Sequence, residues 1–505
     1  MNASAGAFVL LMPPRRKYLI LLHVHLSPAA YASLAVFVAA CIHAPPRIGG
    51  AEGAPKAPNT FWTGPVPTIT PSPDTSARVA TIDRRKLTLA DVVDLALRNS
   101  PATRLSWAQA RAAADQYGSA QGRLYPLVTA DANVARSRSL AAPGRVAGER
   151  TQYGPALNLS YMVLDFGGRS GAIDVARQAA VAADLAHNAT IENTILQVET
   201  AAFTFLATQA ERDAQRAAVE EATAALNAAA ERHEVGLATI ADVLQAQTAR
   251  SQAELSLETL EGALQIARGA LAVAMGLPAN ARIETPDVPA TDSVHFITES
   301  VDSLIEAAVR TRPELAAARA QAAGAASQIR VVRSAALPSL GFTGTGASNG
   351  SNVPTFSGRT YTLNFGVQIP IFSGFANQYD VRAAGDQLQA ALARADATKQ
   401  QVIQQVFTAY YGLRTATDRV RTSRDLLASA TQSESVARGR YREGVGSIVD
   451  LLIAQSALAG ARAQEIDARW QWRAALAQLA HDVGVLNLRG DPLLPSLGSG
   501  GRSDR

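Results

Sequence analysis

Four short segments of the chain alternate apolar and polar side chains, and they form two pairs separated by about two hundred residues. In one of them Tyr361, Leu363 and Phe365 alternate with Thr362 and Asn364. Each run has about ten residues, the length of a tilted strand that crosses a bilayer. The pattern predicts two β-hairpins whose strands have one apolar and one polar face. The predicted strands are about 124–135, 153–164, 336–347 and 360–371.

Alternation is also typical of a soluble β-sandwich, so the small number of strands decides between the two interpretations. Four strands cannot close a barrel, whereas twelve strands from three copies can. The polar positions of these strands would then face a water-filled lumen, as a barrel in lipid requires. Those positions include Asn158, Ser160, Asn364 and Gln368.

Long segments without proline follow each hairpin, at about 171–234 and 376–443. At 1.5 Å per residue, each predicts a helix about 100 Å long. A shorter helix is predicted before each hairpin, at about 89–123 and 300–335. Return helices are predicted to run to about Ala274 and about Val483. An ordinary coiled coil would explain the helices, but not the hairpins between them.

Several anchor sequences recur in the same order in the two halves of the chain, which predicts a duplication. Three pairs of anchors lie 206 to 212 positions apart: residues 98–101 with 310–313, 166–168 with 372–374, and 236–244 with 444–452. We therefore divide the chain into repeat 1 at 86–285 and repeat 2 at 286–488.

Composition supports a mainly helical chain and argues against a nucleic-acid partner. The apolar fraction is 48% and the aromatic fraction only 6%, with alanine, the best helix former, dominating. The formal charge of +4 falls to +1 without Arg15, Arg16 and Lys17 near the N-terminus. No basic stripe interleaved with aromatic residues remains, so nucleic-acid binding is not predicted.

The N-terminal segment has the features of a secretory leader. Three cations are followed by apolar stretches and by small residues that end at Cys41, the single cysteine of the chain. This predicts a signal peptide at 1–40, starting from Met1 or Met12, and a lipidated Cys41. A lone buried cysteine beside an ordinary cleavage site is the alternative. Residues 41–85 predict a lipid-anchored extended segment, and 489–505 a disordered tail.

Catalytic, metal and cofactor sites are not predicted. The seven histidines are scattered without the spacing of metal ligands. Gly344-Thr345-Gly346 precedes a strand instead of opening a helix, unlike a dinucleotide-binding loop.

Each long helix ends in a glycine turn, at Gly236 within RHEVGLATIADVL (232–244) and at Gly444 within RYREGVGSIVDLL (440–452). Together with the duplication, the strand-flanking prolines and the Phe-x-Gly corners, these turns resemble the TolC-like outer-membrane factor family over about residues 85–485. The lipidation signal is similar to that of its lipoprotein efflux branch. The resemblance implies a mainly α protein with transmembrane β-strands, forming a homotrimer with a 12-stranded β-barrel and a 12-helix α-barrel.

In functional terms the resemblance implies an exit duct in the outer membrane that extends into the periplasm. It would serve a tripartite efflux system for drugs, toxic small molecules or metals, with a periplasmic adaptor and an inner-membrane pump as partners. Two alternatives stay open, the outer-membrane component of type I protein secretion and a non-conducting helical spacer. A spacer would not need the polar face of the strands.

The resemblance also implies a periplasmic gate at the glycine turns, formed by Asp242, Tyr441 and Asp450. In the family, residues matching Asp242 and Tyr441 take part in bonds that hold the entrance shut. An arginine that joins this closure in some members corresponds to Gly446, which leaves Arg232 and Arg442 as candidate replacements. The alternative for both aspartates is that they begin the return helices, where an acid complements the helix dipole.

Adaptor docking is assigned to the same ends of the helices, at Gly236, Gly444, Leu244 and Leu452. For the two glycines, a purely structural role as helix C-caps is the alternative.

Overall fold

The structure is a computed structural model that describes residues 87–138, 149–283, 286 and 299–486. All described residues belong to one unit by their internal contacts, within Asp74–Arg505. The predicted leader, Cys41 and the C-terminal tail lie outside the described residues. The described elements follow the predicted order, with two helices, a hairpin, a long helix and a return helix in each repeat.

The four strands form one antiparallel sheet in the order β1-β2-β3-β4. They are β1 Leu127–Ser137, β2 Arg150–Leu164, β3 Ser339–Ser351 and β4 Gly358–Gln368. The first strand of each hairpin begins about three residues later than predicted, just after Pro126 and Pro338. The chain before each proline is still in the turn that ends the preceding helix. β4 ends early because Pro370 has no amide hydrogen for a strand ladder.

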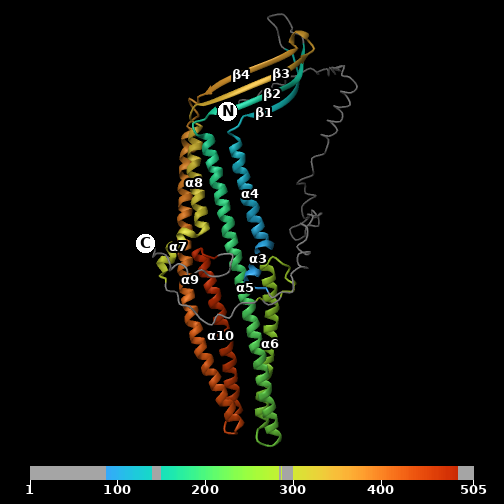
Figure 1. Cartoon of the computed structure of the whole chain (residues 1–505), viewed down its shortest axis with the longest axis vertical. Coiled ribbons are helices and arrows are strands. Elements are labelled where there is room, and N and C mark those ends of the chain that lie inside the picture. Colours follow the sequence, from blue (N-terminus) through green and yellow to red (C-terminus); the bar gives the residue numbers. More distant parts are fainter. Residues whose placement is uncertain (1–86, 139–148, 284–285, 287–298, 487–505) are drawn as a thin grey trace, which may run out of the picture. The chain divides into compact units, whose positions relative to one another are not determined.

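The two long helices, α5 Gly168–Glu234 and α9 Ala376–Arg442, have 67 residues each. The return helices are α6 Ile240–Ala274 and α10 Ile448–Val483. Figure 1 shows α5 beside α6 and α9 beside α10, with the sheet at the opposite end of the long helices from the α5–α6 and α9–α10 turns. The prediction of long helices that pair with return helices is confirmed.

The helix before each hairpin is not continuous, and here the prediction from sequence was wrong. It is broken into α3 Leu89–Asn99 and α4 Pro101–Gly122, and again into α7 Val301–Thr311 and α8 Pro313–Ser334. Proline disfavours the helical region for the residue before it. Ser100 and Arg312 accordingly have ψ angles of 126° and 120°, and a new helix starts at each proline.

Two hydrophobic clusters anchor the short helices α3 and α7 to the long ones. One includes Val92 and Ala96 of α3 with Phe205 of α5 and Leu271 of α6. The other packs Leu304 of α7 on Leu413 of α9 and Leu479 of α10. Each of these side chains is almost fully buried. The short helices therefore meet the long pairs part-way along their length.

Gly276, just after α6, shows how closely the backbone approaches at this level. Its φ is +71°, and a Cβ placed on it would lie 2.8 Å from the backbone carbon of Asn99. Both the left-handed conformation and the contact with another backbone require glycine. Within the described ranges, no helix is both long and apolar enough to cross a membrane.

Candidate functional site

The sheet separates its polar and apolar side chains, as the alternation predicts. Register places Thr129, Asn158 and Thr345 side by side on adjacent strands. The Asn158 amide donates to Asp131 over 2.8 Å, and the Thr345 hydroxyl donates to Asn158 over 2.8 Å. A hydrogen-bonded polar row therefore crosses three strands on one face.

The alternate positions carry large apolar side chains that are exposed in the single chain. Tyr361 is 83% and Phe365 71% exposed, and Leu157, Leu363 and Val134 are also exposed. Large apolar patches of this kind indicate a surface that lipid or another chain covers. Strands β1 and β4 form the edges of this sheet. An open edge cannot face lipid, because its amide and carbonyl groups would have no partner.

The turns at the far ends of the long helices have the same structure in both repeats. The amide of Leu237 donates to the carbonyl of Arg232, and the amide of Val445 donates to that of Arg440. Gly236 and Gly444 have φ angles of +79° and +76°. Both turns are Schellman motifs, in which a left-handed glycine ends the helix. The C-cap role of the two glycines is thus present, whether or not they also dock a partner.

Asp242 begins α6 in a capping box. Its carboxylate accepts from the Thr239 amide over 2.8 Å, and its own amide donates to the Thr239 hydroxyl over 3.3 Å. At the equivalent position of repeat 2, the Asp450 amide donates to Ser447 over 3.1 Å, and Asp450 is exposed. Both aspartates therefore lie in the first turn of the return helices, as the alternative to a gate role predicted. Asp242 makes no hydrogen bond to Tyr441 in this structure.

Tyr441 is buried among alanine and aliphatic side chains from all four helices of the turns, including Ala229, Ala246 and Leu451. Its hydroxyl is buried and has no hydrogen-bond partner within the described parts of the chain. The Arg232 guanidinium lies over its ring, with Cζ 4.3 Å from the ring centroid. Burial raises the pKa of the Tyr441 phenol, and the nearby Asp242 adds to this while Arg232 opposes it.

The apolar residues predicted for docking lie on accessible surface. Leu244 is 55% exposed on α6, and Leu452 of α10 is half-buried. Leu452 lines a groove of about 510 Å³ at the ends of the helices. The other lining residues are Gln245, Val449, Ile453, Ser456 and Ala457. Such a groove offers an apolar contact surface next to the turns.

A buried ionic cluster that was not predicted from the sequence lies where α8 begins. Arg312 is only 4% exposed. Its guanidinium donates to Glu314 over 3.0 Å and to Asp482 over 3.2 Å. It also donates to the Gln405 side chain and to the His481 carbonyl. One arginine thus joins the start of α8 to α9 and α10, and its charge is compensated by two carboxylates.

His481 extends this cluster to repeat 1. Its Nδ1 is 2.9 Å from Asp482, and its Nε2 is 3.1 Å from the Asn193 side-chain oxygen on α5. Burial opposes ionisation of Asp482, but hydrogen bonds from His481 and Gln478 and the charge of Arg312 lower its pKa overall. Burial, with the Glu314 carboxylate, raises the pKa of Glu192 to about 7, against the opposing effects of His481 and Arg312.

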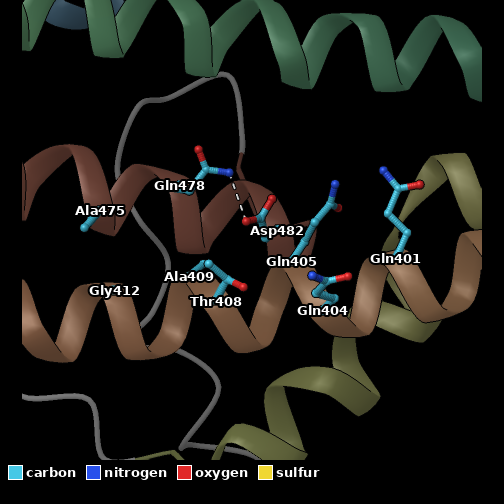
Figure 2. A pocket seen from close by; sticks show the side chains of 9 residues that line it. All are labelled: Gln401, Gln404, Gln405, Thr408, Ala409, Gly412, Ala475, Gln478 and Asp482. Carbon is cyan, nitrogen blue, oxygen red and sulfur yellow. Dashed lines mark hydrogen bonds between the residues drawn. The ribbon is translucent and has the colours of Figure 1, made fainter.

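A polar groove of about 520 Å³ lies beside this cluster between α9 and α10. Figure 2 shows Gln405 and Asp482 in the space between the two helices, with the hydrogen bond from Gln478 to Asp482. The remaining lining residues are Gln401, Gln404, Thr408, Ala409, Gly412 and Ala475. Among the described residues, no group of three or more histidine, cysteine, aspartate or glutamate side chains is arranged to hold a metal ion.

One sequence signal could have identified Arg312. Its counterpart in repeat 1 is Ser100, which caps α4 by accepting from the Ala102 amide. An arginine in the place of a helix cap cannot accept that bond. This departure from the repeat therefore indicates that residue 312 does something other than cap the helix.

Comparisons with known proteins agree with this architecture. The family model described as outer membrane efflux protein matches residues 92–277 and 304–485. Protein CyaE of Bordetella pertussis is 29% identical over 80% of this chain and 86% of its own length. Outer membrane protein TolC of Vibrio cholerae is 27% identical over 79% of this chain and 91% of its own length. The crystal structure of outer membrane protein VceC from Vibrio cholerae shares the fold, with a TM-score of 0.70 at 19% identity, covering 78% of this chain and 96% of that one.

Proposed function

We propose, from the premise that this chain belongs to the outer membrane efflux protein family, that three copies form the exit duct of a tripartite efflux system. Members of this family are outer-membrane channels, so the chain is a duct protein and not an enzyme. The finer parts of the proposal are the trimer, the adaptor and pump, the gate, and the transport of drugs, toxic small molecules or metals.

The sheet is the observation that carries the proposal of a trimeric duct. It has a hydrogen-bonded polar row on one face and exposed apolar side chains on alternate positions. Three such sheets joined edge to edge would give twelve strands, enough for a water-filled barrel with its apolar side toward lipid. A non-conducting spacer has no use for this polar face.

Single-channel conductance of the purified full-length protein in a planar bilayer tests this function, after mass determination by light scattering. A trimer with discrete, mostly closed channels is the expected result. A monomer, or a trimer that never conducts, would overturn the duct. Mass spectrometry of the same preparation reports whether Cys41 carries lipid, as the lipid-anchor proposal requires.

The gate proposal assigns Asp242 and Asp450 different roles that the same recording separates. Asp242→Ala removes the carboxylate half of the capping box of α6 and leaves the Thr239 cap in place. We expect the loosened turn, which packs near Tyr441, to give more frequent openings. Three exposed copies of Asp450 would attract cations to the entrance, so we expect Asp450→Asn to lower cation selectivity without more frequent openings. Unchanged openings in Asp242→Ala would remove that residue from the gate.

Docking of a periplasmic adaptor is proposed at the turns, where Gly236, Gly444, Leu244 and Leu452 form the accessible ends of the helices. We expect Leu244→Asp to weaken adaptor binding roughly thirtyfold, the effect of losing about 2 kcal/mol of apolar contact. Efflux of a fluorescent dye from cells should fall, while conductance of the purified channel stays normal. Leu255→Asp is the matched control, because Leu255 is 58% exposed on the same helix but further from the turn. Equal efflux by the two variants would contradict docking at Leu244.

Type I protein secretion remains the second candidate, because it would use the same duct architecture. The family description, outer membrane efflux protein, favours efflux. Cells that depend on this chain should lose resistance to small toxic compounds when it is deleted, and retention of full resistance would favour secretion.

A further inference from the structure

Of the two arginines that the sequence offers as replacements at the entrance, Arg232 makes the contacts between the two helical pairs at their turns. The α5–α6 turn and the α9–α10 turn belong to different repeats, and Arg232 and Arg442 are 210 positions apart. The Arg232 guanidinium makes two contacts across this gap. Its Cζ lies 4.3 Å from the centroid of the Tyr441 ring, and its Nη2 donates to the Arg442 carbonyl over 3.0 Å.

In this structure the Tyr441 hydroxyl meets no hydrogen-bond acceptor on the other turn. That hydroxyl has no hydrogen-bond partner in the described part of the chain. Asp242, the acceptor that the family resemblance suggests for Tyr441, instead accepts hydrogen bonds from the amide and the hydroxyl of Thr239. The polar contact between Tyr441 and the other turn is therefore made on the face of its ring, where a cation is favourable.

Gly446 has no side chain, so it cannot itself supply a basic group at this turn. A Cβ at this position would lie 3.0 Å from the Cβ of Arg440 and 3.2 Å from the amide nitrogen of Tyr441. Its own amide is also occupied, because it donates to the Arg440 carbonyl over 3.0 Å. A side chain at this position would be in tight contact with the turn, and the basic group that lies over the Tyr441 ring comes from α5.

The chemistry of the guanidinium suits this position. It is planar, so it stacks on an aromatic ring while its edge keeps N–H groups for a carbonyl acceptor. The contact is partly withdrawn from water, because Tyr441 is 6% exposed and Arg232 is half-buried. Both conditions strengthen a cation–π contact compared with an exposed one.

We propose that Arg232 is the latch of the periplasmic entrance, holding the α5–α6 turn to the α9–α10 turn of the same chain through the Tyr441 ring and the Arg442 carbonyl. This proposal rests on the proposed gated duct, and it names the contact that keeps the gate closed. In this chain a cation–π contact takes the place of a hydrogen bond between a phenol and a carboxylate, and no basic residue is needed at position 446.

The test compares single-channel openings of full-length Arg232→Ala with wild type. Loss of a cation–π contact and one hydrogen bond should raise the ratio of open to closed states about tenfold. Arg442→Ala is the matched control, because it removes an exposed basic side chain at the same turn but keeps the carbonyl that Arg232 uses. We expect this control to open like wild type.

Substitutions of Tyr441 separate the ring from the hydroxyl. Tyr441→Phe keeps the ring and should change the open ratio less than about twofold, whereas Tyr441→Leu should open like Arg232→Ala. The double variant Arg232→Ala/Tyr441→Leu should open no more than either single variant, because both remove the same contact. Circular dichroism and the trimer mass check that every variant is folded.

Each outcome bears on one proposal. If Tyr441→Phe opens as widely as Tyr441→Leu, the hydroxyl holds the entrance and the Arg232 latch is overturned. Wild-type gating of Arg232→Ala in a conducting trimer overturns the latch but leaves the duct intact. Absence of conductance in every variant and in wild type overturns the duct itself.

Discussion

Replacing Arg312 with alanine is expected to lower the free energy of unfolding by about 3–5 kcal/mol, because it leaves the buried Asp482 carboxylate without its arginine. Asp482 is almost fully buried and depends on Arg312 at 3.2 Å, and Glu314 is bonded to the same guanidinium. A buried charge that loses its partner retains the cost of desolvation without the attraction that compensated it. Thermal and urea unfolding in detergent, followed by circular dichroism, measure the change.

Arg310→Ala is the matched control for this prediction. Arg310 lies two residues earlier, and its ion pair with Glu306 has both side chains at least 70% exposed. Exposed pairs contribute little to stability, so we expect the control to unfold like wild type. Arg312→Lys keeps the charge but loses the planar fork that serves several acceptors, and should fall between the two. Equal stability of Arg312→Ala and Arg310→Ala would show that the cluster does not hold the helices together.

The second large effect is a loss of stability as the pH rises, caused by buried glutamates of α5. Glu199 is 3% exposed, and burial raises its pKa from 4.5 to about 7. Between these values the folded chain binds a proton that the unfolded chain has released, so stability falls with increasing pH across this window. A shift of this size corresponds to about 3 kcal/mol between pH 4.5 and pH values above 7.

Glu199→Gln removes this titration and should flatten the dependence of unfolding on pH between 5 and 8. At pH 8 the variant should be more stable than wild type, and at pH 5 about equal to it. Glu231→Gln, which replaces an exposed carboxylate of the same helix, should leave the wild-type profile unchanged. Glu192→Gln should flatten the profile in the same direction, since burial and Glu314 raise the pKa of Glu192 to about 7 as well. A flat wild-type profile would contradict both assignments.

These two effects act at the level where α3 and α7 meet the long helices, away from the turns that form the proposed entrance. Variants of the cluster therefore test the stability of the helical body, and variants of Arg232 test the gate. A variant at Arg312 that changed channel opening while leaving stability intact would indicate that the two levels are coupled.

The order of the elements follows from the sequence, because local chemistry sets it. The long helices contain no proline, and each ends at a glycine with positive φ, as predicted. Strand alternation predicted two hairpins, and the register confirms one polar and one apolar face. The breaks before Pro101 and Pro313 were missed although their signal, the proline itself, is local. β1 and β3 began late because the turn that ends the preceding helix runs up to Pro126 and Pro338. β4 ended early because Pro370 has no amide for the ladder.

What only the tertiary structure decided is which distant side chains meet. Arg312 and Asp482 are 170 positions apart, and neither residue type predicts burial by itself. A charged side chain is buried only together with a partner of opposite charge, and the fold brings the two together. From the sequence, Asp242 could have stabilised the start of its own helix or bonded Tyr441. In the structure its carboxylate accepts from the nearby Thr239 amide, so it stabilises the start of α6. The choice of Arg232 over Arg442 depends on which guanidinium reaches the Tyr441 ring across two helical pairs. Sequence periodicity fixes the face of one helix, but the facing residue of another helix depends on how the two are packed together.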